Sequence, residues 1–252
     1  MKRSINKIIL LFIVSILLTI NSVARPAYPA EAFAFTVKTD NNGSSSDLQF
    51  DIPTHPTYSS DYNYNVDCEG DGTYEHTGIT GDFTCNYTNK GTYTIAIGGI
   101  FPAIYFHNEG DKEKITSVSQ WGTQEWKTMG SAFSGASNLV VHAYDNPDLS
   151  NVNNMNSMFY NATALTFTFS IDDWDVSFVE DMSMMFTGAT VFNNNISSWD
   201  VSSVTTMNGM FYDATAFNQD IENWDTSKVL YLSSMFLRAE NFNQDIGDWD
   251  VS

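Results

Sequence analysis

Basic side chains are scarce in this sequence, which has 11 Lys and Arg residues against 30 Asp and Glu residues. The formal net charge of the chain is -19 at pH 7. Proteins bind nucleic acid and anionic lipid surfaces largely through Lys and Arg side chains that neutralise phosphate groups. The composition therefore excludes nucleic acid as a partner, and it favours solubility and an attraction for cations.

Residues typical of catalytic sites are equally sparse. The four histidines are scattered, and the sequence contains no H-E-x-x-H, G-x-S-x-G or C-x-x-C motif and no phosphate-binding loop. We therefore expect no enzymatic activity. No catalytic or cofactor-binding residue is assigned, and no cofactor is expected.

A long apolar run that could cross a membrane is also missing. The run from Ile8 to Ile20 is shorter than a comfortable membrane span, and it follows three basic residues within the first seven positions. We predict a signal peptide at residues 1–24, cleaved after Ala24, with cleavage after Ala30 as the alternative. The mature protein would then have no membrane span and would be secreted or held at the bacterial cell surface.

Only two cysteines are present, Cys68 and Cys85. An even number of cysteines in an exported chain predicts a disulfide, and two buried free thiols are the weaker interpretation. The bridge would close a short loop and stabilise the fold by roughly 3 kcal/mol by restricting the unfolded chain. Both cysteines also fall on the inward face of alternating segments, which suits an internal bridge.

Residues 31–107 show the alternation of short β-strands. Between Thr92 and Ile97, for example, every second residue is large and apolar. Turn signals such as Asn42-Gly43 and Gly98-Gly99 separate these segments. The pattern predicts a small β-sandwich.

A family resemblance appears in the same region. The string V-D-C-E-G-D-G begins at Val66, and F-T-C-N-Y-T-N-K-G-T-Y-T-I-A-I begins at Phe83. Together they resemble the polycystic-kidney-disease (PKD) type of immunoglobulin-like domain. Cys68 and Cys85 stand near the family's usual aromatic residue and histidine, a departure that suits a disulfide-linked variant. The resemblance implies an all-β immunoglobulin-like sandwich over residues 31–107.

The second half of the chain repeats itself. Trp174, Trp199, Trp224 and Trp249 recur every 25 residues, each within a W-D-x-S phrase. A fixed period of this length predicts a solenoid, in which stacked units bury one shared apolar core. We place the solenoid at residues 108–252, with a degenerate first repeat. The C-terminal cap of the solenoid is missing, so we expect either that the chain is a fragment of a longer array or that its last coil is frayed.

Each unit carries a helix-like pattern. Val204, Met207, Phe211 and Ala214 have the spacing of one helix face, and Ser202 has the position of a helix N-cap. We therefore predict units of a short helix followed by a short extended segment, a leucine-rich-repeat-like coil. The recurrence assigns the following side chains to the repeat core: Trp174, Trp199, Trp224, Trp249, Met185, Met210, Met235, Phe186, Phe211 and Phe236.

The repeats resemble a known family as well. The phrase M-F-x-x-A-x-x-F-N-Q-D-I-x-x-W-D-x-S spans Met210 to Ser227 and again Met235 to Ser252. It is similar to the BspA-like leucine-rich repeats of bacterial surface proteins, which are shared with mycoplasma surface lipoproteins. This resemblance implies a multi-domain, exported protein that acts in adhesion, with no catalytic residues to carry over.

One acidic turn is a weak candidate for calcium. Asp67, Glu69 and Asp71, followed by glycine, imitate the first half of a calcium-binding loop. The twelfth position is Gly78 rather than glutamate, so a plain acidic turn is the favoured interpretation.

The aspartates of the W-D phrases are a second weak candidate. A period of 25 stacks Asp200 and Asp225 in one column, where neighbouring carboxylates repel one another. Either backbone N–H donors at each helix start or bridging calcium ions must offset that repulsion. The chain lacks the G-G-x-G-x-D phrase of calcium-binding β-rolls, which favours the local donors.

Two hypotheses for function follow. The first is an exported interaction or adhesion protein that binds an extracellular protein or glycan through its repeats. The alternative is an acidic, calcium-stabilised structural spacer at the cell surface. Varied and aromatic side chains exposed along one face of the repeats would favour the first, and uniformly acidic columns would favour the second.

Overall fold

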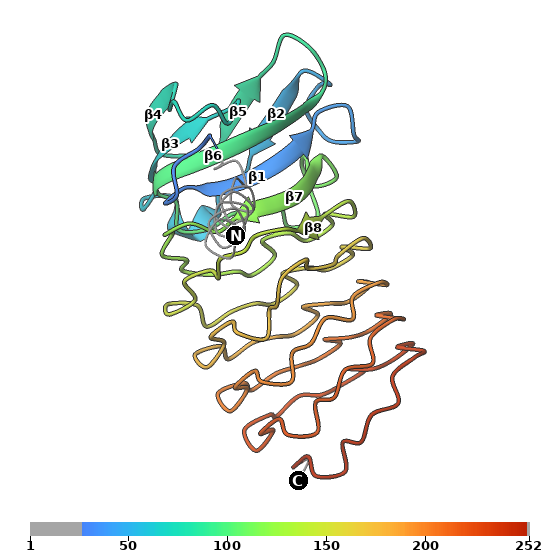
Figure 1. Cartoon of the computed structure of the whole chain (residues 1–252). Helices are drawn as coiled ribbons and strands as arrows, with labels where there is room; N and C mark the ends of the chain where they lie inside the picture. The colour runs from blue at the N-terminus through green and yellow to red at the C-terminus, as the bar shows by residue number, and fades with distance from the viewer. Residues whose placement is uncertain (1–26, 251–252) are drawn as a thin grey trace, which may run out of the picture.

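The computed structural model describes residues 27–250, so the predicted signal peptide lies outside the described residues. The described chain consists of β-strands and turns (Figure 1). Its one helix there is η1, a 3-10 turn at Pro56–Tyr58. The strands are β1 (Phe33–Lys38), β2 (Gln49–Ile52), β3 (Asn63–Asp67), β4 (His76–Ile79), β5 (Phe83–Asn86), β6 (Thr92–Ile100), β7 (Ile115–Gln120) and β8 (Val140–Val141).

Six strands form one mixed sheet in the order β4-β3-β6-β1-β7-β8, and β2 pairs with β5 in a separate two-stranded sheet. β1 runs antiparallel to β6 and β7, whereas β7 runs parallel to β8. Because β7 and β8 belong to the repeat region, the sheet continues past residues 107 and 108 (Figure 1). One hydrophobic cluster likewise extends from Phe33 to Trp249.

β1 lies inside the sheet, and both of its faces are covered. Phe33, Phe35 and Val37 point into the main cluster. Ala34 packs with Ala96 in a small second cluster on the opposite face. This burial explains why most of the strand is apolar, since a strand covered on both faces has few solvent-facing positions, and only its last residue, Lys38, is exposed.

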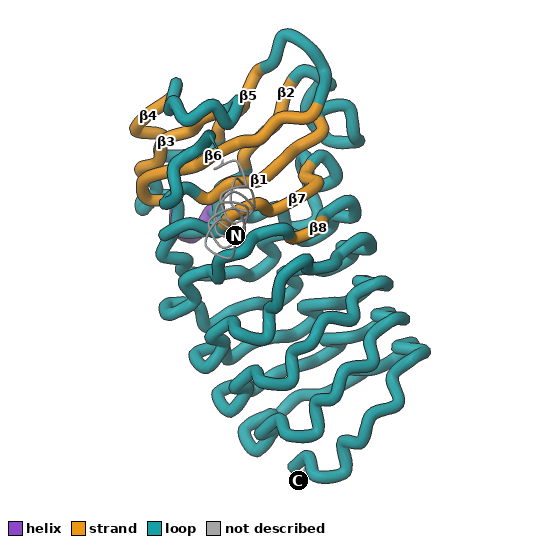
Figure 2. Tube along the Cα trace, in the orientation of Figure 1, coloured by secondary structure: helices purple, strands orange, loops and turns teal. Residues whose placement is uncertain are grey.

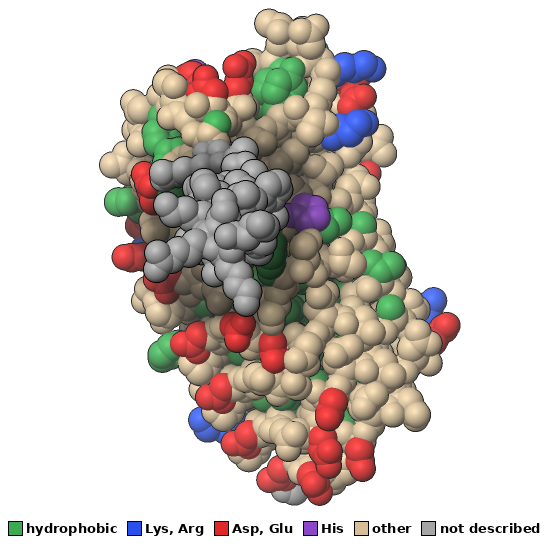
Figure 3. Space-filling view, viewed as in Figure 1, with side chains coloured by type: hydrophobic (Ala, Val, Ile, Leu, Met, Phe, Trp, Pro, Cys, Tyr) green, Lys and Arg blue, Asp and Glu red, His purple; other side chains and the backbone are tan. Residues whose placement is uncertain are grey.

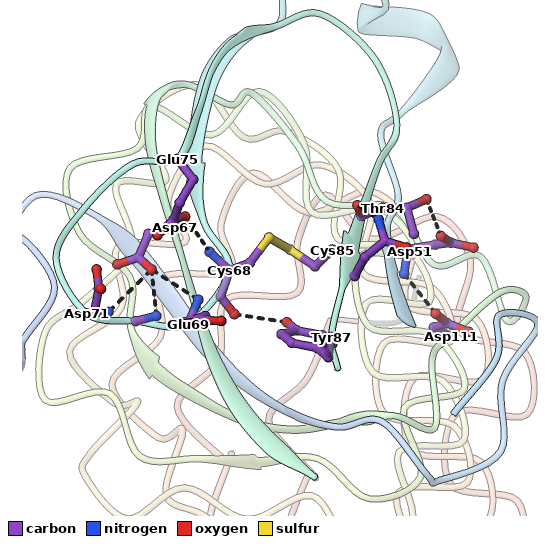
Figure 4. The surroundings of a disulfide bond; sticks show 12 residues. Asp51, Asp67, Cys68, Glu69, Asp71, Glu75, Thr84, Cys85, Tyr87 and Asp111 are labelled. Atoms are coloured by element: carbon purple, nitrogen blue, oxygen red, sulfur yellow. Dashed lines mark hydrogen bonds between the residues drawn. A yellow bond between two sulfur atoms is a disulfide. The ribbon is translucent and has the colours of Figure 1, made fainter. Parts of the chain in front are cut away.

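The predicted disulfide is confirmed. Cys68 follows β3 in the six-stranded sheet, Cys85 lies in β5 of the two-stranded sheet, and their Cα atoms are 5.7 Å apart (Figure 4). Both cysteines are buried. The bridge therefore links the two sheets covalently, and the Tyr87 hydroxyl adds a hydrogen bond of 2.9 Å to the Cys68 carbonyl.

Beyond β8 the chain winds into coils that stack on one another and consist almost entirely of turns (Figure 2). Backbone N–H groups alternate in direction along each coil. In one coil, Met182, Met184, Phe186 and Gly188 donate to carbonyl groups of the next coil. The intervening Met185, Thr187 and Ala189 donate to carbonyl groups three residues back in their own coil.

This alternation requires left-handed backbone at regular intervals. Met184 has a φ of 55° and Gly188 a φ of 70°, four residues apart. Glycine adopts a positive φ readily, whereas other residues seldom do. A residue with positive φ interrupts the helical path of the backbone and changes the direction of the next N–H group. The other coils repeat the feature at Ser131 and Gly135, Ser157 and Asn161, Gly209 and Asp213, and Ser234 and Arg238.

The predicted fold class, an immunoglobulin-like sandwich followed by a solenoid of helix-plus-extended units, is therefore wrong. The sheet is mixed and extends into the repeat region, and the repeat segments predicted to be helical are successive turns. A spacing of three to four residues between apolar side chains fits a chain of turns as well as a helix. Here the carbonyls of the next coil accept the N–H groups that a helix would have used internally.

The side chains assigned to the repeat core do lie in a shared interior. The methionines and tryptophans of the set are buried, as are Phe186 and Phe211, while Phe236 in the last coil is partly buried. Phe186, Phe211 and Phe236 form a column of parallel rings, with centroids 5.7 Å apart at each step. The Trp199, Trp224 and Trp249 indoles each donate a hydrogen bond to a carbonyl group of the preceding coil.

Candidate functional site

One side of the stack is built from the segment between each W-D-x-S turn and the first core methionine. Parallel β-bridges join Asn154 to Asp181, Asp181 to Thr206 and Thr206 to Tyr231, so this segment has a fixed register from coil to coil. We call the outward positions of the segment the varied face. Its three columns are Glu125, Asn151, Phe178, Ser203 and Lys228; Lys127, Asn153, Glu180, Thr205 and Leu230; and Asn154, Asp181, Thr206 and Tyr231.

The varied face exposes large apolar side chains. Phe178 is 55% exposed, Leu230 is 73% exposed and Tyr231 is 58% exposed. The neighbouring coils carry polar residues at the same positions, so the repeat structure does not require an apolar group there. Exposed apolar area is unfavourable in water, and adjacent exposed apolar side chains such as Leu230 and Tyr231 are typical of an interaction surface.

A hollow of about 660 Å³ lies at the end of the varied face nearest the sheet. Tyr58 of η1 lines it together with residues of the first three repeat segments, among them Lys127 and Phe178. The Lys127 ammonium nitrogen is 2.6 Å from an Asp61 carboxylate oxygen and 5.8 Å from the Tyr58 ring centroid. The ion pair lowers the pKa of the Asp61 carboxyl, chiefly through the hydrogen bond from Lys127.

The W-D aspartates find their partners locally. An Asp200 carboxylate oxygen accepts the Ser202 N–H at 3.0 Å, and Asp225 accepts the Ser227 N–H at 3.0 Å. Hydrogen bonds from each serine, first its hydroxyl and then its N–H, lower the pKa of both carboxyls. The predicted local donors are present, but they close turns of the Asp-x-Ser type rather than begin helices.

A second polar column connects the coils on their outer edge. The Asn218 side-chain oxygen accepts hydrogen bonds of 2.9 Å from the Asn243 N–H and from the Gln244 side chain in the next coil. Asn193 accepts the same pair from Asn218 and Gln219. The F-N-Q phrase of the repeat is thus a structural ladder.

The acidic turn near the disulfide has one buried carboxylate. Asp67 is fully buried and accepts hydrogen bonds from four backbone N–H groups, those of residues 69–72 (Figure 4). Within the described part of the chain, one group of carboxylates could hold a metal ion: Asp67, Asp71 and Glu75. Glu69, which the sequence suggested, is not in this group, and Glu75 takes its place. The four N–H donors give Asp67 a structural role without an ion.

Sequence reasoning did not find the residues of the varied face. Phe178, Leu230 and Tyr231 lie one or two positions from the valine of their unit, Val179 or Val229, and none belongs to the repeated phrase. The signal was available as a departure from the repeat, because each replaces a polar residue of the neighbouring units. Tyr58 could not have been found in this way, since the fold alone brings it to the repeats.

Among residues 27–250 no helix is both long enough and apolar enough to span a bilayer. The family model described as "Mycoplasma protein of unknown function, DUF285" matches residues 105–170 and 165–252, which is more than half of the chain. The chain therefore belongs to the DUF285 family. No curated protein and no solved structure matches it.

Proposed function

We propose that this DUF285 chain is an exported interaction protein, secreted or held at the cell surface, which binds an extracellular protein or glycan through its varied face. The observation that carries the proposal is the exposure of Phe178, Leu230 and Tyr231 at positions where neighbouring coils have polar residues. A purely structural stack gains nothing from such side chains, whereas aromatic and apolar anchors supply much of the energy of protein interfaces.

The resemblance of the repeats supports the same role, because BspA-like repeats occur in bacterial surface proteins that act by binding. The regular register of the coils also suits recognition, because a repeat stack offers an extended surface whose outward residues can change without altering the core.

An array of extracellular-matrix proteins and glycans, probed with the full chain, tests the proposal. Replacing Phe178, Leu230 and Tyr231 together by serine should abolish the binding that the unmodified protein shows. The matched control is Leu237→Ser, because Leu237 is 51% exposed in the last coil but lies outside the varied face. Unchanged binding by the triple variant, or no binding by the unmodified chain, would contradict the proposal.

The alternative is an acidic spacer stabilised by calcium. Acidic side chains do gather over the C-terminal coils, as Figure 3 shows. Asp200 and Asp225, however, already accept hydrogen bonds from their own turns. Thermal melting with calcium and with a chelator separates the two functions, because an ion bound only by the native state must raise the midpoint. We expect the same midpoint in both conditions.

A further inference from the structure

Two aromatic rings from different parts of the chain, Tyr58 and Phe178, line the hollow at the sheet end of the varied face. Tyr58 lies beside Lys127 of the first coil, as the 5.8 Å contact shows. Phe178 belongs to the third coil, so it stands two coil spacings, roughly 10 Å, further along the stack. Both rings line the same hollow. Two coil spacings correspond to about the length of a disaccharide.

Polar groups without side-chain partners also line the hollow. The Glu125 carboxylate and the Asn153 amide line the hollow and have no side-chain partner among the described residues. Asn151 is held only by a contact of 3.5 Å to the Ser150 hydroxyl. Amides and carboxylates can each bind a pair of neighbouring hydroxyl groups, because together they offer both donors and acceptors.

Charge narrows the choice of ligand. Asp61 neutralises Lys127 at 2.6 Å, and Lys127 is the cation among the described residues that line the hollow, so these residues leave no free positive charge for an anionic ligand. The chain as a whole carries a formal charge of -19, which repels anions from a distance. Among the described residues that line the hollow, Glu125 is the only carboxylate, so the hollow itself adds little local attraction for a polycation. A neutral ligand rich in hydroxyl groups remains.

We propose that this hollow binds two consecutive sugar rings of a neutral glycan. One sugar stacks on Tyr58 and the other on Phe178, and Glu125, Asn151 and Asn153 bind hydroxyl groups between them. Sugar rings present apolar C–H faces, and an aromatic ring with one exposed face is their usual partner in proteins. This inference rests on the proposed function and identifies the partner at one end of the varied face.

Calorimetric titration of the full chain with neutral hexasaccharides tests the inference. The probes are cellohexaose, xylohexaose, maltohexaose and chitohexaose, with hexagalacturonate as the anionic comparison. At least one neutral probe should bind, and hexagalacturonate should not. Phe178→Ala and Tyr58→Ala should each weaken binding about threefold to tenfold. Phe169→Ala is the matched control, since Phe169 is 51% exposed and does not line the hollow.

The outcomes separate this inference from the proposed function. If no neutral probe binds, or if Phe178→Ala binds as tightly as the unmodified chain, the inference is wrong. If, in addition, a matrix protein binds and the paired change of Leu230 and Tyr231 to serine abolishes that binding, the proposed function stands without the glycan. If neither saccharide nor matrix protein binds, both fail. Preferential binding of hexagalacturonate would overturn the charge argument and with it the inference.

Discussion

Removing one ring from the phenylalanine column should show how far stability depends on the stacking of coils. Phe211 is fully buried, with Phe186 and Phe236 at 5.7 Å on either side and Phe217 at 3.8 Å. Phe211→Ala deletes a ring that no neighbouring side chain can replace. Changes of this kind cost about 3–5 kcal/mol. Small proteins have only about 5–15 kcal/mol of stability, so the effect is a large part of the total.

The same change at two other positions supplies the comparison. Phe236 is only partly buried in the last coil and has one ring of its column beside it, so Phe236→Ala should cost about 1–2 kcal/mol. Phe178→Ala removes an exposed ring and should change the free energy of unfolding by no more than about 0.5 kcal/mol.

Urea denaturation followed by tryptophan fluorescence measures all three variants. Hydrogen exchange adds spatial resolution, because coils of a stack are stabilised mainly by their nearest neighbours. In Phe211→Ala, the protection of backbone N–H groups from exchange should fall most in the coils that contain Phe186, Phe211 and Phe236. Equal losses for Phe211→Ala and Phe178→Ala would refute the reasoning, since the burial of the ring would then not determine the cost.

Three further predictions concern the sheet end and the acidic turns. Cys68→Ser removes the bridge to β5 and should lower the free energy of unfolding, measured in urea, by roughly 3 kcal/mol. A reductant should lower the free energy of unfolding of the unmodified chain by the same amount, and it should cause no further loss in the variant. Lys114 is buried beside Asp111 at 3.5 Å, so Lys114→Met leaves a buried carboxylate without its cation and should cost about 3–5 kcal/mol, whereas the same change at the exposed Lys90 should cost almost nothing. Hydrogen bonds from Ser202 lower the pKa of Asp200 in the folded chain. The contribution of Asp200 to stability is therefore complete above the unfolded pKa of about 3.9, and it is lost as the pH falls through the folded pKa. The melting temperature should fall in that acid range, and it should fall less steeply in Ser202→Ala.

The sequence by itself determined which side chains face the interior of the repeats and how they align. The recurrence of Trp199, Trp224 and Trp249 fixed the register, because any other alignment would place indoles on the surface. It also determined the pairing of Cys68 with Cys85, since no other cysteine is available. These features depend on the period and on residue type, both of which are visible in one dimension.

Only the tertiary structure decided the backbone of each coil. The spacing of Met207, Phe211 and Ala214 is compatible with a helix and with successive turns, and the choice depends on where the N–H groups find acceptors. With a neighbouring coil in place, its carbonyls accept every second N–H group, and left-handed residues such as Gly188 make the required turns. The presence of Tyr58 and Phe178 in the lining of one hollow has the same origin, because residues far apart in sequence come near one another only through the packing of the sheet on the first coils.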